Sequence, residues 1–142
     1  MKNKSQIFLY VVLISLFLST CTSQEAFEIS CDNFYETQHR SYDIEISVGD
    51  EFDFALCSNP STGFQWMEQA EISDPELIEQ VGHEMVPSAE THPPPPPGSP
   101  GEQVWSFKAL GPGQCAISLE YSQPWDGGEK AVWTFVLNVS VE

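Results

Sequence analysis

Apolar side chains occupy every second position in the stretch from Tyr42 to Leu56. The alternation is interrupted only at Gly49-Asp50, two residues that suit a tight turn. A period of two is typical of a strand that buries one of its faces. This stretch therefore predicts two strands around a turn.

Similar alternating runs follow at residues 104–109, 115–121 and 131–141, separated by residues that favour turns. There is no long amphipathic helix. Asp74-Pro75-Glu76 predicts either a single helical turn through Ile78 or a strand. About seven short strands with this spacing predict an all-β fold, a sandwich of two sheets. Trp66, Trp105 and Trp133 lie in alternating strands, so we expect them in the core.

Residues 83–101 interrupt the pattern and are expected to be irregular. Five consecutive prolines, residues 93–97, lack the amide donors that a sheet needs and favour polyproline II. This run predicts a stiff exposed loop. Its alternative role, a ligand for a proline-binding domain, is left open.

The N-terminal segment predicts export. Lys2 and Lys4 precede an apolar run over residues 7–18, which is too short to span a bilayer comfortably. We interpret residues 1–20 as an export signal, residues 21–40 as a leader and residues 41–142 as one domain. Leu18-Ser19-Thr20-Cys21 resembles a prokaryotic lipoprotein box, although Thr20 does not fit it well. The chain is therefore either lipid-anchored through Cys21, at the cell surface or in the periplasm, or freely secreted.

Acidic residues outnumber basic ones by 21 to 5, which gives a formal charge of −16. Removal of residues 1–20 takes away two lysines and no acidic residue, so the charge of the remainder is about −18. Without a basic patch, nucleic acid and anionic lipid surfaces are not expected as partners. The charge either keeps the chain soluble or steers a basic partner towards it, an effect that salt weakens.

Enzyme chemistry does not assemble in this sequence. It has no Gly-x-Ser-x-Gly elbow, no phosphate-binding glycine loop with its lysine and no His-Glu-x-x-His pair. His39, His83 and His92 have no metal-like spacing with the cysteines. We therefore expect no catalytic activity, no metal site and no cofactor.

Residues 57–66 read Cys-Ser-Asn-Pro-Ser-Thr-Gly-Phe-Gln-Trp. This segment closely resembles the Asn-Pro-Thr-Thr-Gly-Phe/Tyr motif of the chagasin family of cysteine peptidase inhibitors, and Ser61 is its one departure. Val48-Gly49-Asp50-Glu51 is similar to the family's entry into the preceding strand.

Two further elements follow in the family's order, so the resemblance extends over residues 42–141. Gly98-Ser99-Pro100-Gly101 resembles a Gly-x-Gly-Gly loop before an aromatic strand, with Pro100 in place of a glycine. Gln123-Pro124-Trp125 resembles Arg-Pro-Trp after a tyrosine strand, with Gln123 in place of the arginine. A charge contact that relatives make through this arginine is therefore not implied here.

The resemblance implies an immunoglobulin-like sandwich that acts as a monomer. Three loops at one end would block the cleft of a papain-like cysteine peptidase, reversibly and competitively. The central loop would enter the cleft with Thr62 nearest the catalytic cysteine, and Trp125 would be the main anchor. The residues implied in peptidase binding are Asn59, Pro60, Ser61, Thr62, Gly63, Phe64, Gly98, Ser99, Pro100, Gly101, Gln123, Pro124 and Trp125.

Cys21, Cys31, Cys57 and Cys115 are candidate disulfide partners in an exported chain. Cys57 would end its strand at the central loop, whereas the strand of Cys115 would reach that end only at Tyr121. The two thiols would then be roughly 20 Å apart, which is beyond disulfide reach. We predict no bond between them, and Cys31 remains free to pair with either.

The main alternative is an immunoglobulin-like adhesion or ligand-binding module whose loops contain turn residues for structural reasons only. Such a module would tolerate replacement of Thr62 or Trp125. A secreted hydrolase, the third hypothesis, would turn over a substrate by itself.

Asn138-Val139-Ser140 matches a glycosylation sequon within the last strand, and we interpret it as chance. The target peptidase is left open, either endogenous or foreign.

Overall fold

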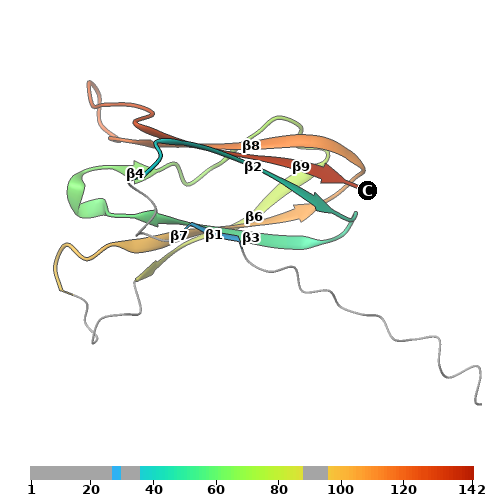
Figure 1. Cartoon of the computed structure of the whole chain (residues 1–142), viewed down its shortest axis with the longest axis horizontal. Coiled ribbons are helices and arrows are strands. Elements are labelled where there is room, and N and C mark those ends of the chain that lie inside the picture. Colours follow the sequence, from blue (N-terminus) through green and yellow to red (C-terminus); the bar gives the residue numbers. More distant parts are fainter. Residues whose placement is uncertain (1–26, 30–35, 88–95) are drawn as a thin grey trace, which may run out of the picture.

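The computed structural model of the chain describes residues 27–29, 36–87 and 96–142. In these residues the chain forms nine strands and one short 3-10 helix, and no α-helix. The strands build two sheets that form the two layers of a sandwich (Figure 1). The predicted all-β sandwich is thus confirmed.

The smaller sheet has four strands in the order β1-β3-β7-β6. β1 runs parallel to β3, and β7 is antiparallel to both of its neighbours. The bounds are β1 Phe27–Ile29, β3 Glu51–Ser58, β6 Ile78–Pro87 and β7 Gly101–Ala109.

The larger sheet has the order β2-β9-β8-β4, and β5 also pairs with β8. β2 is parallel to β9, while the other pairs are antiparallel. The bounds are β2 His39–Ile46, β4 Gln65–Trp66, β5 Glu71–Ile72, β8 Gly113–Ser122 and β9 Trp133–Val141. β2 and β3 therefore lie in different sheets, and the turn between them carries the chain across the sandwich.

Aromatic rings fill the space between the sheets. The Phe54 ring stacks on those of Trp105 and Phe107 in its own sheet, and lies 4.9 Å from the Phe135 ring of the opposite sheet. All four side chains are at most 1% exposed. Alternation places them there, because every second residue of each strand faces inward. Trp66 and Trp105 are buried as expected, and Trp133 is only partly buried.

The prediction that residues 83–101 are irregular is partly wrong. The chain from Ile78 to Pro87 is a ten-residue strand, and Gly101 already belongs to β7. A β-bulge between Gln80 and Gly82 shifts the register of β6. A bulge breaks strict alternation, and β6 also lies at the edge of its sheet. Because of these two features, β6 lacks the regular alternation of apolar and polar residues that predicted the other strands.

The expected number of about seven strands omitted β1 and β5, which have three and two residues. Elements this short carry no periodic pattern. At Asp74, the helical-turn alternative is closer: the Asp74 carboxylate accepts from Glu76 N at 3.1 Å, and Leu77 N donates to Asp74 O at 3.1 Å. The strand then begins at Ile78.

The cysteines bear out one prediction. Cys57 is disulfide-bonded, whereas Cys115 is buried and free. The absence of a Cys57–Cys115 bond is therefore confirmed. Cys115 Sγ instead donates to Asp74 O at 3.6 Å, and Tyr121 pairs with Trp66 at the opposite end of β8.

Several predictions fall outside the described residues. They concern the export signal at residues 1–20, the lipidation candidate Cys21, the pairing of Cys31 and most of the proline run. The described strand β1 falls within the segment expected as a leader. No helix in the described parts of the chain is long and apolar enough to cross a membrane.

Ser58 gives a prediction about stability. Its side chain is fully buried at the end of β3, and its hydroxyl has no hydrogen-bond partner among the described residues. Burial of an unsatisfied polar group costs free energy. Ser58→Ala should therefore raise the free energy of unfolding by about 1 kcal/mol in a urea titration. Ser118→Ala, on β8, is the control and should leave it unchanged; a loss of stability in Ser58→Ala would contradict the prediction.

Candidate functional site

Three loops lie together at one end of the sandwich, on the left in Figure 1. Loop 1, residues 59–64, leads from β3 to β4. Loop 2, described over residues 96–100, leads into β7, and loop 3, residues 123–132, joins β8 to β9. The opposite end carries the turn at residues 47–50 and the last residue, Glu142 (Figure 1). Twelve of the thirteen predicted site residues lie in these loops, and Gly101 opens β7 beside them.

Loop 1 holds its shape through its own hydrogen bonds. Its centre is a 3-10 turn, Pro60–Thr62, which the Asn59 side chain caps by accepting from Ser61 N at 3.2 Å. Thr62 donates to Asn59 O twice, from its amide at 3.1 Å and from its hydroxyl at 2.7 Å. Gly63 ends the turn at a φ of +84°, a conformation that glycine adopts without strain.

Tyr121 fixes the base of loop 1 from the other sheet. Its hydroxyl accepts from Asn59 N at 3.1 Å. Its buried ring stacks on Phe64 with centroids 5.8 Å apart and contacts Trp66 at 5.1 Å. The two ends of loop 1 are therefore attached to one rigid side chain.

Trp125 of loop 3 packs on loop 1. A Cβ placed on Gly63 would lie only 2.9 Å from Cη2 of the Trp125 ring, so the ring sits directly against the glycine. The side chain is nevertheless 50% exposed. A large apolar ring that is fixed on one side and open to solvent on the other is suited to meet a partner.

Loop 2 lies against the other side of loop 1. An ideal Cβ on Gly98, whose φ is +88°, would be 3.7 Å from Ser61 Oγ. Ser99 closes the turn by donating to Pro96 O from its amide at 3.1 Å and its hydroxyl at 2.8 Å. Loops 2 and 3 thus both lie beside loop 1.

Gln123 and Lys130 shape loop 3 from within. Gln123 Oε1 accepts from Glu129 N at 3.0 Å. The Lys130 ammonium donates to Gln123 O at 2.5 Å and to Trp125 O at 3.1 Å. Sequence reasoning missed Lys130, although it is the single basic residue after Lys108. Gln123 therefore stabilises the conformation of loop 3. The positively charged side chain in this loop is that of Lys130.

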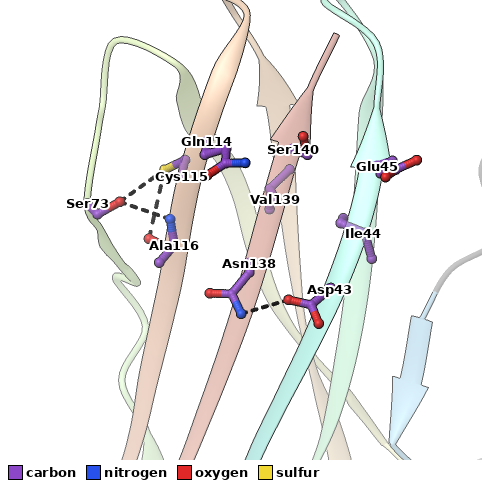
Figure 2. Close-up of a pocket in the computed structure, with 10 residues that line it drawn as sticks. All are labelled: Asp43, Ile44, Glu45, Ser73, Gln114, Cys115, Ala116, Asn138, Val139 and Ser140. Carbon is purple, nitrogen blue, oxygen red and sulfur yellow. Dashed lines mark hydrogen bonds between the residues drawn. The ribbon is translucent and has the colours of Figure 1, made fainter.

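A groove of about 730 Å³ opens on the larger sheet, away from the three loops. Figure 2 shows that polar side chains of the groove already have partners within the protein: Asn138 Nδ2 donates to Asp43 Oδ1 at 2.9 Å, and Ser73 Oγ accepts from the backbone N of Ala116 at 2.9 Å. No group of His, Cys, Asp or Glu among the described residues is arranged to hold a metal ion. The three loops therefore remain the candidate site.

Comparison of the sequence with known families gives one match over most of the described part. The model of the chagasin family of peptidase inhibitors, I42, matches residues 45–139. Amoebiasin-2 of Entamoeba histolytica is 30% identical over 98 residues, which are 69% of this chain and 76% of that protein.

Solved structures share the fold. The cysteine protease inhibitor EhICP2 of Entamoeba histolytica superposes with a TM-score of 0.61 and 23% identity, over 82% of this chain and 96% of that one. PbICP-C, solved in complex with falcipain-2, gives a TM-score of 0.56 and 18% identity, over 84% of this chain and 100% of that one. At these identities the likeness concerns the immunoglobulin-like fold, which was predicted.

Proposed function

Because this chain belongs to the chagasin family of peptidase inhibitors, we propose that it inhibits papain-like cysteine peptidases by inserting loop 1 into the active-site cleft. Family membership makes it an inhibitor and not an enzyme. The observation that carries the proposal is that loops 2 and 3 both lie beside loop 1, with Trp125 next to Gly63 and Gly98 next to Ser61. Together they form one edge of the sandwich, with loop 1 between the other two (Figure 1).

The shape of loop 1 supports reversible inhibition without cleavage. A peptidase cleaves an extended segment whose carbonyl is open to attack by the thiolate. Residues 60–62 instead form a 3-10 turn, and Asn59 O already accepts two hydrogen bonds from Thr62. Little conformational entropy is lost on binding, because the loop is already ordered. In this proposal Thr62, at the end of the turn, would lie nearest the catalytic cysteine.

Support for the papain-like class comes from two sources. The segment at residues 59–64 closely resembles a motif of cysteine peptidase inhibitors, and one protein of the same fold was solved in complex with falcipain-2. Loop 2, including Pro100, and loop 3, including Pro124, would flank the cleft on either side.

We further propose that the chain acts outside the cytoplasm, as a monomer. The basic and apolar pattern of residues 1–20 supports export, and Cys21 offers a site for a lipid anchor. Fractionation of the native chain and of Cys21→Ser tests this: release of the variant from membranes indicates an anchor, and equal solubility indicates free secretion. Retention of both proteins in the cytoplasm would contradict export.

The direct test is a titration of papain with the purified chain at several substrate concentrations. We expect inhibition that substrate relieves, that reverses on dilution and that leaves the chain uncleaved. Trypsin, a serine peptidase, is the control and should be unaffected. The absence of inhibition at micromolar concentration across several papain-like enzymes would overturn the proposal in favour of an adhesion module.

A further inference from the structure

Gln103 is an unusual residue for its position. It lies on the inward face of β7 between Gly101 and Trp105, and it is only 5% exposed. A buried carboxamide destabilises a core unless its oxygen and its nitrogen both find partners. Here both atoms do, and the two partners belong to different strands.

The first partner is the backbone of Trp66, just beyond loop 1. β4 pairs with β8 on one side only, and on that side Met67 N donates to Glu120 O at 3.2 Å. The amide of Trp66 donates instead to Gln103 Oε1 at 3.2 Å, in the opposite sheet. This bond connects the two sheets at the point where loop 1 ends.

The second partner fixes the direction of the hydrogen bonds. A backbone N–H can only donate, so the Gln103 atom that faces Trp66 must be the oxygen. The Gln103 amide nitrogen then faces His83 Nε2 at 3.3 Å and donates to it. His83 must accept at Nε2, and its ring is held beside Trp105 with centroids 5.1 Å apart.

We propose that Gln103 and His83 are positioning residues for loop 1. A one-way relay from the amide of Trp66, through the Gln103 carboxamide, to His83 Nε2 holds the C-terminal end of the loop against the smaller sheet. This role rests on the proposed function of loop 1, whereas the relay itself is a property of the free protein. Neither residue lies in the three loops, so neither is expected to contact the peptidase.

The test uses Gln103→Leu, His83→Leu and His83→Gln in the full chain. Amide hydrogen exchange of Trp66, followed by NMR, reports on the relay without a peptidase. We expect exchange at Trp66 to accelerate at least tenfold in Gln103→Leu and severalfold in His83→Leu. Both variants should inhibit papain about tenfold more weakly. His83→Gln places an amide oxygen near the position of Nε2, so it should restore both values to within twofold.

Gln80→Leu is the matched control. Gln80 of β6 also bonds to the backbone of another segment, accepting from Ala70 N at 2.8 Å and donating to Glu68 O at 2.9 Å, but it holds the connection between β4 and β5 and not the amide of Trp66. The Gln80→Leu variant should be less stable than the wild-type chain and should still inhibit papain normally. If Gln103→Leu does not fold, the two His83 variants decide, since that ring is only partly buried.

Two results would overturn the proposal. Unchanged exchange at Trp66 in both leucine variants would show that the relay does not hold this amide. Faster exchange with unchanged inhibition would show that the relay stabilises the fold without positioning loop 1. A wild-type chain that fails to inhibit would refute the proposed function, but the exchange data would still decide whether the relay exists.

Discussion

Replacement of Gly63 by alanine should weaken the inhibition of papain about 100-fold, which is roughly 3 kcal/mol at 1.4 kcal/mol per tenfold. Gly63 has a φ of +84°, where an L-residue is strained by roughly 1–2 kcal/mol. The added Cβ would also lie 2.9 Å from Cη2 of Trp125, so the ring must move. If loop 1 of the free Gly63→Ala variant changes conformation to relieve this strain, binding to papain must restore the original, strained conformation. Inhibition constants and a urea titration of both proteins provide the measurement.

Gly49→Ala is the control for strain alone. Gly49 has a φ of +92°, and an added Cβ would have nothing within 4 Å. It lies in the turn between β2 and β3, at the end of the sandwich opposite the loops. Both variants should lose similar stability, but Gly49→Ala should inhibit normally. Equal inhibition by the two variants would show that the fit of loop 1 against Trp125 is unimportant.

The sequence predicts those parts of the fold that depend on local pattern. Strict alternation around Phe54, Trp105 and Phe135 identifies β3, β7 and β9, because a residue's neighbours two positions away share its face. Loop 1 is equally local: a capping asparagine, a proline and a glycine within five residues specify its turn. The absence of a Cys57–Cys115 bond could be predicted because strand direction fixes which residues reach each end.

The parts not predicted depend on contacts between distant segments. The bulge near Gln80 becomes visible only through the pairing of β6 with β7. Lys130 stabilises loop 3 by donating to backbone carbonyls. Every residue has such a carbonyl, so the residue types around Lys130 do not reveal these bonds. The inward position of Gln103 was not predicted, because a polar residue does not mark a buried face, and its partners, Trp66 and His83, come from two other strands.

The structure also changes the interpretation of Gln123. Its side chain is neutral where the motif that this segment resembles has an arginine. Its side chain is already bound to Glu129 N within loop 3, and Lys130 occupies two carbonyls of the same loop. Loop 3 is therefore held in shape by its own residues. This leaves the exposed face of Trp125 as its main surface for a partner.

Trp125→Ala should accordingly weaken inhibition by at least about 30-fold, because a preorganised aromatic that is buried on binding is typically worth 2 kcal/mol or more. The ring is 50% exposed, so its loss should change the stability of the free chain little. Leu110→Ala is the matched control: Leu110 is 44% exposed at the opposite end, and its removal should leave inhibition unchanged. Inhibition constants and thermal melting of the three proteins provide the comparison.

A double variant separates the two roles of this ring. If Gly63→Ala acts by displacing Trp125, then its effect should largely disappear in a chain that already carries Trp125→Ala. Additive losses would instead mean that loop 1 and Trp125 contribute independently, and that their contact in the free protein is incidental. Full inhibition by Trp125→Ala alone would remove Trp125 as an anchor. Binding would then depend on loop 1 and on the backbone of loop 2.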